Sequence, residues 1–321
     1  MLATVFAIAM TSVHAAEWQL QRTEYGHPDL QGVWFYGTST PFERPAQLGT
    51  KKIYSEAEVA ILLQSLDDAE QDNAKPLDLD RDAPESGAAI AQEADHNFAT
   101  LRTNPIIIDG NFRTSQIISP EDGRLPFRAG GKDIFMNWID QGFGPFDGPE
   151  VRPASERCTG PNGGPMAPMV SWFYNANMQI IQTAEYVVIL AEMNHDARII
   201  PLADSESEKT TPQWMGKSRG RWEDDSLVVE TSNFRPEQSW FAFLMSDQLS
   251  VSERFTLIGN DEILYSYTFT DPKIYTAPVT VEKTITRRRA GENLFEYACH
   301  EGNYSTPSIL AGARVQELRV D

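Results

Sequence analysis

The stretch SVSERFTLIGNDEILYSYTFT, residues 250–270, decides the fold. Two β-prone runs, residues 250–258 and 263–270, flank the turn-forming residues 259–262, which predicts a hairpin. The next run, residues 279–288, alternates strictly, with Val279, Val281, Lys283 and Ile285 on one side. Such period-2 alternation is typical of a strand with one buried face. The core of the chain is therefore predicted to be an antiparallel β-meander.

Working outward, the same signals recur along the chain. Hairpins are predicted for residues 178–183 with 186–193 and for residues 219–222 with 226–231, and single strands for 33–36, 113–118, 198–202 and 294–299. No helical pattern is interleaved between them, which argues against a parallel sheet. A meander of this length usually closes or stacks to protect its edges. We expect a mainly β, antiparallel, lipocalin-like barrel in a single domain over residues 16–321, with a two-sheet sandwich as the alternative.

The N-terminal half differs from this meander. Ser55 and Glu58 form a capping-box pattern that predicts a helix over residues 55–70, and residues 132–140 predict a short second helix. We therefore expect a helix and loop insertion at about residues 40–145. Residues 141–170 are rich in Gly and Pro and are too long for an ordinary connection, which marks them as a candidate functional loop.

The first residues and the cysteines indicate the compartment. Residues 2–13 are apolar apart from Thr and Ser, and Val13-His14-Ala15 has small residues at the positions that a signal peptidase reads. This pattern predicts a signal peptide over residues 1–15, cleaved after Ala15, and a periplasmic or secreted protein. A short apolar strand or helix is the alternative. The chain has 2 cysteines, so an oxidising compartment predicts a Cys158–Cys299 disulfide. The alternatives are two unpaired thiols or a catalytic Cys299.

Charge and missing motifs exclude several functions. With 27 basic and 46 acidic residues, the formal net charge is −19, which repels nucleic acids and anionic membrane surfaces. No apolar run is long enough to span a bilayer. The sequence has no GxSxG elbow and no Walker loop. We expect no nucleic-acid partner, no membrane span and no cofactor.

Four candidate acid–base residues come in two adjacent pairs, His195 with Asp196 and His300 with Glu301. Histidine is the natural general base near neutral pH. Neighbouring strand residues point to opposite faces, so cross-strand pairs, His195 with Glu301 or His300 with Glu192, are geometrically easier. The alternatives are buried structural histidines and a metal site, although no HxH or HxxxH spacing supports a metal.

Arginines and aromatic residues complete the predicted site. Arg157 and Arg198 are candidates for stabilising a developing anion, with structural salt bridges as the alternative. Aromatic segments near turns predict a lining for a flat apolar ligand, with plugs of a barrel end as the alternative. The predicted substrate-binding residues are Trp172, Tyr174, Asn175, Trp214 and Tyr304.

Two resemblances add to these patterns. Residues 32–34, Gly-Val-Trp, resemble the G-x-W opening of lipocalin-like barrels. The segments EMNHDARIIPL (192–202), QWMGKSRGRWE (213–223) and YACHEGNY (297–304) resemble a large family of exported bacterial proteins of mostly unknown function. That likeness covers roughly residues 28–315 and implies a context of bacteria that degrade plant-derived and aromatic compounds.

Together, these features predict an exported hydrolase or lyase without a redox cofactor. It would cleave a C–O bond in a small apolar, aromatic compound, such as a lignin-derived aryl ether, by His/carboxylate acid–base chemistry. The alternatives are a non-catalytic carrier of a similar ligand and a structural or protein-binding module.

Overall fold

The computed structural model describes residues 18–76, 103–159, 167–171, 175–202, 211–236 and 243–319. The expected signal peptide, residues 1–15, lies outside these ranges. Among the described helices, none combines the length and the apolar character needed to cross a bilayer.

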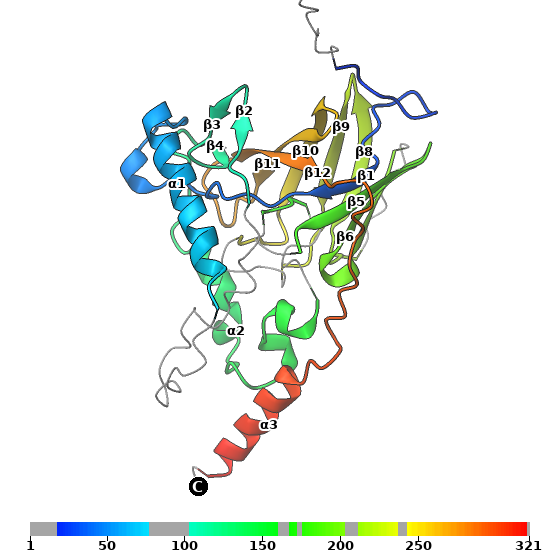
Figure 1. The fold of residues 1–321 in the computed structure, drawn as a ribbon. Coiled ribbons are helices and arrows are strands. Elements are labelled where there is room, and N and C mark those ends of the chain that lie inside the picture. The colour runs from blue at the N-terminus through cyan, green and yellow to red at the C-terminus, as the bar shows by residue number, and fades with distance from the viewer. Residues whose placement is uncertain are drawn as a thin grey trace, which may run out of the picture.

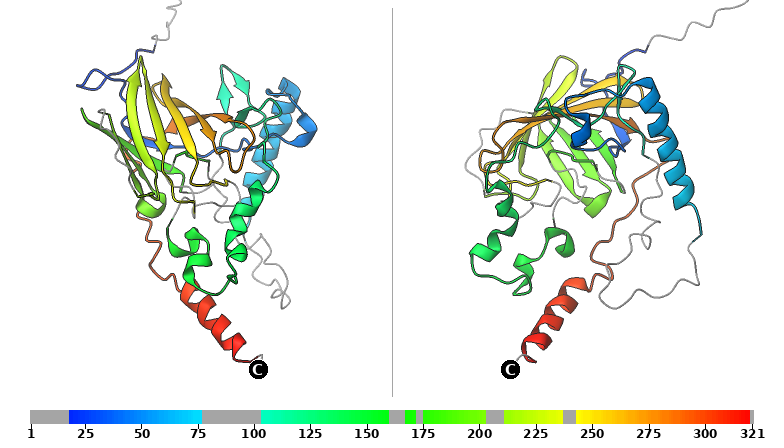
Figure 2. Two further views of the ribbon diagram at one scale, coloured as in Figure 1. Left: turned by 180° about the vertical axis from the view of Figure 1, so that it is seen from behind. Right: turned by 90° about the vertical axis from the view of Figure 1, so that its left-hand side faces the viewer.

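The described residues form one large antiparallel sheet that curls into a nearly closed barrel (Figures 1 and 2). Along its main path the strand order is β7-β6-β5-β1-β12-β11-β10-β9-β8. This confirms the predicted lipocalin-like barrel over the two-sheet sandwich. The strands of this path are β1 (Gly32–Phe35), β5 (Asn177–Gln182), β6 (Tyr186–Ala191), β7 (Ala197–Pro201), β8 (Lys217–Glu223), β9 (Ser226–Ser232), β10 (Ser250–Gly259), β11 (Glu262–Thr270) and β12 (Val279–Arg287).

The barrel is brought together at β7 and β8, the two ends of the strand order. Side chains join these strands: Arg198 Nε on β7 donates to Ser218 Oγ on β8 at 2.9 Å. Gly220 on β8 permits the approach, because a Cβ atom there would lie 2.8 Å from Ile200 Cγ2. A larger residue at position 220 would therefore push the two strands apart.

Alternation along the strands fills the barrel. On β11, Tyr265, Tyr267 and Phe269 are buried, and the residues between them are partly exposed. The register sets Phe255 of β10 opposite Tyr265, and Tyr265 opposite Lys283 of β12. Most inward residues are apolar and pack into one core. The charged inward residues are exceptions, and they define the site described below.

The predicted insertion flanks the barrel and contributes to it. Helix α1 (Glu56–Asn73) begins with the expected capping box at Ser55 and Glu58 and runs along the outside of the molecule (Figure 1). The second expected helix forms as a 3₁₀ turn, η3 (Gly131–Met136), followed by the short α2 (Asn137–Asp140). Residues 113–118 were predicted as one strand, but β3 (Asn111–Phe112) pairs with β2 (Ile107–Ile108), whereas β4 (Ile117–Ser119) pairs with β12. The insertion is thus partly continuous with the barrel sheet.

The C-terminal part departs most from expectation. Residues 294–299 were predicted as a strand, which is wrong, because they run as an irregular arm outside the sheet. Helix α3 (Ser305–Glu317), which follows, was not expected; it projects away from the barrel (Figure 2). The predicted Cys158–Cys299 disulfide is confirmed, with Cα atoms 5.8 Å apart. It ties the arm to the 3₁₀ turn η5 (Ala154–Arg157).

Candidate functional site

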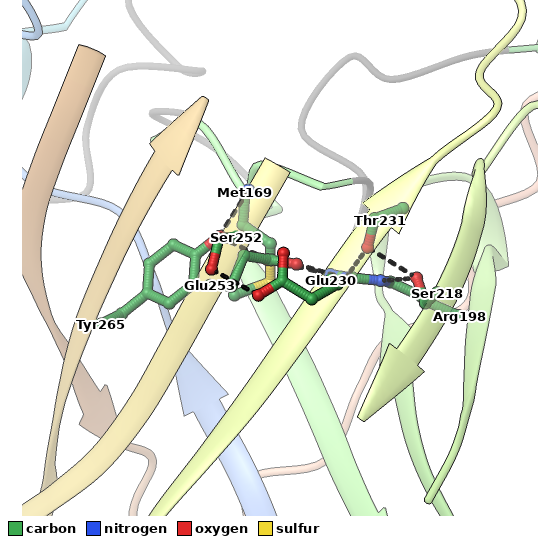
Figure 3. A network of polar contacts seen from close by, with 8 residues as sticks. All are labelled: Met169, Arg198, Ser218, Glu230, Thr231, Ser252, Glu253 and Tyr265. Carbon is green, nitrogen blue, oxygen red and sulfur yellow. Dashed lines mark hydrogen bonds and ion pairs between the residues drawn. The ribbon is translucent and has the colours of Figure 1, made fainter. Parts of the chain in front are cut away.

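A row of polar side chains crosses the interior of the barrel (Figure 3). The guanidinium of Arg198 on β7 forms a bidentate ion pair with the carboxylate of Glu253 on β10, in which Nη1 lies 2.9 Å from Oε1 and Nη2 contacts Oε2. Glu253 Oε1 also accepts a hydrogen bond from the Tyr265 hydroxyl at 2.7 Å. The row therefore links β7 to the neighbouring strands β10 and β11, which are not adjacent to β7 in the sheet order.

Full pairing makes these buried charges tolerable. The side chains of Arg198 and Glu253 are 1% and 0% exposed, and an unpaired charge in such surroundings costs several kcal/mol. Arg198 uses two further donors on Ser218 Oγ and on Thr231 Oγ1, the latter at 2.7 Å. The neighbouring Ser252–Glu230 hydrogen bond in Figure 3 belongs to the outer face of β9 and β10.

The row continues through the backbone of Met169. The Met169 N–H donates to the Tyr265 hydroxyl at 3.0 Å, and its carbonyl accepts a hydrogen bond from Lys283 Nζ at 2.7 Å. Burial, and next the charge of Glu253, raises the pKa of Tyr265 well above its ordinary value. Tyr265 therefore stays protonated and acts as a hydrogen-bond donor.

Lys283 is the second charged group inside the barrel. It is 0% exposed. Within the described residues its amine donates to three neutral oxygens: Met169 O at 2.7 Å, Tyr36 O at 3.1 Å and Ser171 Oγ at 3.0 Å. The rings of Tyr36 and Tyr265 flank it, with centroids 5.1 and 5.6 Å from Nζ. Burial lowers the pKa of Lys283 to about 7, so a substantial fraction of the amine is neutral at physiological pH.

Two phenol groups near this row lack hydrogen-bond partners. The hydroxyls of Tyr36 and Tyr267 are buried and unpaired within the described part of the chain. Burial raises the pKa of both groups, with the charge of Glu192 contributing at Tyr36 and that of Glu253 at Tyr267. An unmet buried donor costs about 1–3 kcal/mol. Among the described residues, both phenols therefore keep a proton that is not donated to another group.

The predicted base His195 lies in the 3₁₀ turn η6 (Met193–His195), not at a strand end. Its Nε2 atom accepts a hydrogen bond from the Tyr297 backbone N–H at 3.0 Å, so the ring fastens the C-terminal arm. That contact occupies the lone pair that a general base would use. The adjacent Asp196 is half-buried, and burial raises the pKa of its carboxyl.

The second pair sits on the arm. His300 and Glu301 are exposed in a turn beside the disulfide, where the expected strand is missing. Tyr304 is 75% exposed. Arg157 adjoins Cys158, and its Nε atom is buried without a hydrogen-bond partner among the described residues. None of these four side chains has a hydrogen bond to the interior row within the described residues.

The remaining predicted residues are Asn175, Trp214, Trp172 and Tyr174. Asn175 donates to the buried carboxylate of Glu192 at 3.0 Å, and Glu192 also accepts the Phe295 N–H at 3.0 Å, so both residues help to dock the arm. Trp214 stacks under the guanidinium of Arg235, 4.4 Å from its ring centroid. Trp172 and Tyr174 lie outside the described residues.

The described residues contain no cluster of three or more His, Cys, Asp or Glu side chains that could hold a metal ion. The interior row consists of an amine, a guanidinium, a carboxylate and a phenol, which move or hold protons and donate to oxygen atoms. Its chemistry is therefore that of acid–base catalysis or of binding an oxygen-bearing molecule.

Of the residues predicted from sequence, Arg198 lies in the interior row. Lys283, Glu253, Tyr265 and Ser171 were missed. A usable signal existed for two of them, because Lys283 and Glu253 each interrupt an otherwise apolar face of an alternating strand. A charged residue at an inward position is costly, so it is a stronger pointer to a site than an exposed histidine.

Comparison with models of known protein families finds none that matches this chain. Comparison with curated proteins likewise finds no match.

Proposed function

We propose that this protein is an exported enzyme that cleaves a C–O bond in a small apolar, aromatic compound by acid–base chemistry. Lignin-derived aryl ethers and aryl esters are two substrate classes of this kind. The observation that carries the proposal is the buried amine of Lys283, which contacts neutral oxygens and has a pKa of about 7. A general base is most effective when its pKa lies near the working pH.

The interior row favours Lys283 over His195 and His300 as the general base. The lone pair of His195 Nε2 is already used by the Tyr297 N–H, and His300 is exposed on the arm. In the proposal Lys283 takes the proton, and the Arg198–Glu253–Tyr265 row holds the Met169 backbone against it. Export is compatible with the Cys158–Cys299 disulfide, which favours an oxidising compartment.

The experiment is a screen of the purified mature protein. Small aromatic ethers and esters are incubated with it at pH 8, and paired products are sought by mass spectrometry. We expect cleavage, and a loss of about 100-fold or more in Lys283→Met. Asp225→Ala, which alters an exposed ion pair with Arg22, serves as the matched control. Equal turnover by Lys283→Met and the wild type would overturn the assignment of the base.

A non-catalytic carrier is the second candidate. The hydroxyls of Tyr36 and Tyr267, which have no partner in the part of the chain that the structure describes, favour it, because they would donate to acceptor atoms of a ligand without any reaction. A carrier would bind aromatic compounds in the screen and return them unchanged. Tyr267→Phe would then weaken binding, whereas an enzyme without such contacts would be unaffected.

A further inference from the structure

Ser171 and Lys283 are within hydrogen-bond distance of each other. Lys283 Nζ lies 3.0 Å from Ser171 Oγ, which is the separation expected of a nucleophile and its base. Ser171 Oγ also lies 3.0 Å from Gln116 Oε1 and 3.4 Å from Tyr36 O. A hydroxyl has one proton to donate. The Ser171 O–H therefore points either at Gln116 Oε1 or, when the amine is neutral, at Lys283 Nζ.

Ser171 and Lys283 differ in burial, as a nucleophile and a shielded base should. Ser171 is partly exposed, whereas Lys283 lies fully buried behind it. The base is therefore screened from water, and Ser171 is the member of the pair that has exposed surface. Water exclusion keeps the amine from being protonated as readily as in solution.

The surroundings of Lys283 also suit a neutral amine. A neutral amine has two N–H donors and one lone pair, and two of its three contacts, Met169 O and Tyr36 O, accept hydrogen bonds only. The third contact, Ser171, is a hydroxyl that can donate to the lone pair. When the amine is neutral, the Ser171 hydroxyl can turn from Gln116 Oε1 and donate its proton to the nitrogen that would remove it. The lowered pKa of Lys283 is consistent with that state.

From this geometry we infer that Ser171 is a nucleophile and Lys283 its general base, and that the pair hydrolyses a neutral carboxylic ester of a small aromatic acid or phenol. This inference rests on the proposed function and narrows its C–O bond to that of an ester. A neutral substrate is favoured because the net charge of −19 repels anions.

The reaction balances in two steps. The Ser171 oxygen attacks the acyl carbon while its proton passes to Lys283 Nζ, the bond from the acyl carbon to the alcohol or phenol oxygen breaks, and the ammonium returns the proton to that leaving oxygen. Water then attacks the acyl-Ser171 ester, with Lys283 again accepting and returning a proton. The products are a carboxylic acid and an alcohol or phenol, and both residues are regenerated.

Phenylmethanesulfonyl fluoride, a small neutral aromatic reagent, tests the nucleophile independently of any substrate. We expect one label per chain, mapped by peptide mass spectrometry to Ser171, with a rate that rises with pH and levels off above the pKa of about 7. Ser171→Ala should take up no label, and Lys283→Met should react about 100-fold more slowly. Ser252→Ala, on the outer face of β10, is the serine control and should be labelled like the wild type.

Turnover of 4-nitrophenyl acetate supplies the second measurement. A burst of nitrophenolate equal to the protein concentration, lost in Ser171→Ala, supports an acyl-enzyme. Absence of label at Ser171, or a rate that climbs with hydroxide without levelling, overturns the inference. If the reagent fails to label Ser171 and the protein nevertheless cleaves an aryl ether, the Ser171–Lys283 pair is overturned and the proposed function stands. Label at Ser171 without cleavage of any ether or ester would contradict the proposed function instead.

Discussion

Arg198 and Glu253 face each other inside the barrel as a bidentate ion pair, with Nη1 2.9 Å from Oε1 and both side chains almost fully buried. The strands that carry them, β7 and β10, are not neighbours in the sheet. The pair therefore spans the interior, and it holds Tyr265 in place through the same carboxylate.

Glu253→Gln should be strongly destabilising. It leaves the Arg198 guanidinium buried without a counter-charge, which costs about 3–5 kcal/mol of unfolding free energy. Urea unfolding measures the loss. Asp225→Ala, which breaks an exposed pair with Arg22, should change stability by less than about 1 kcal/mol. Equal effects of the two substitutions would show that the interior pair is dispensable.

The stability of the protein should rise with pH through Lys283. Its pKa is about 7 in the folded state and about 10.4 when unfolded. Between these values the unfolded chain binds one more proton, so the free energy of unfolding increases by up to about 1.4 kcal/mol per pH unit. Below pH 7 Lys283 is protonated in both the folded and the unfolded state, so its contribution to the free energy of unfolding no longer changes with pH.

The matched measurement compares the wild type with Lys283→Met by urea unfolding at pH 7, 8 and 9, below the range where tyrosines titrate. The difference between the two proteins should grow in favour of the wild type as the pH rises. A constant difference would mean that Lys283 titrates at its ordinary pKa, and would remove the basis for its role as a base.

Removing the disulfide should cost about 4–5 kcal/mol. Cys158 and Cys299 are separated by 141 residues, and closing so long a loop restricts the unfolded chain strongly. Urea unfolding of Cys158→Ser/Cys299→Ser against the wild type measures the effect. Thiol titration of the denatured, unreduced wild type should find no free thiol; two free thiols would contradict the bond.

His195→Ala should loosen the C-terminal arm. The Tyr297 N–H would lose its acceptor, which costs about 1 kcal/mol. Thermal unfolding and protease cleavage after Arg288 measure the loss. His300→Ala, whose ring is exposed, is the control and should stay within about 0.5 kcal/mol of the wild type. A loss of turnover in His195→Ala with unchanged stability would instead indicate that His195 is the general base.

Local patterns predicted most elements of the barrel. The alternation over residues 279–288 became β12, and the hairpin at residues 250–270 became β10 and β11. The strand prediction for residues 294–299 was wrong because these β-prone residues have no neighbouring strand to pair with among the described residues. The disulfide and the carboxylate of Glu192 hold them outside the sheet instead.

The sequence by itself determined the strand periodicity, the helix cap at Ser55 and the pairing of the two cysteines, because each depends on nearby residues or on a count. It also put Lys283 on the inward face of its strand. Only the tertiary structure decided which inward residues meet: Glu253 is 55 positions from Arg198, and Met169 is 114 positions from Lys283. Those contacts depend on how the sheet curls and closes, and the period of a strand carries no information about its curvature.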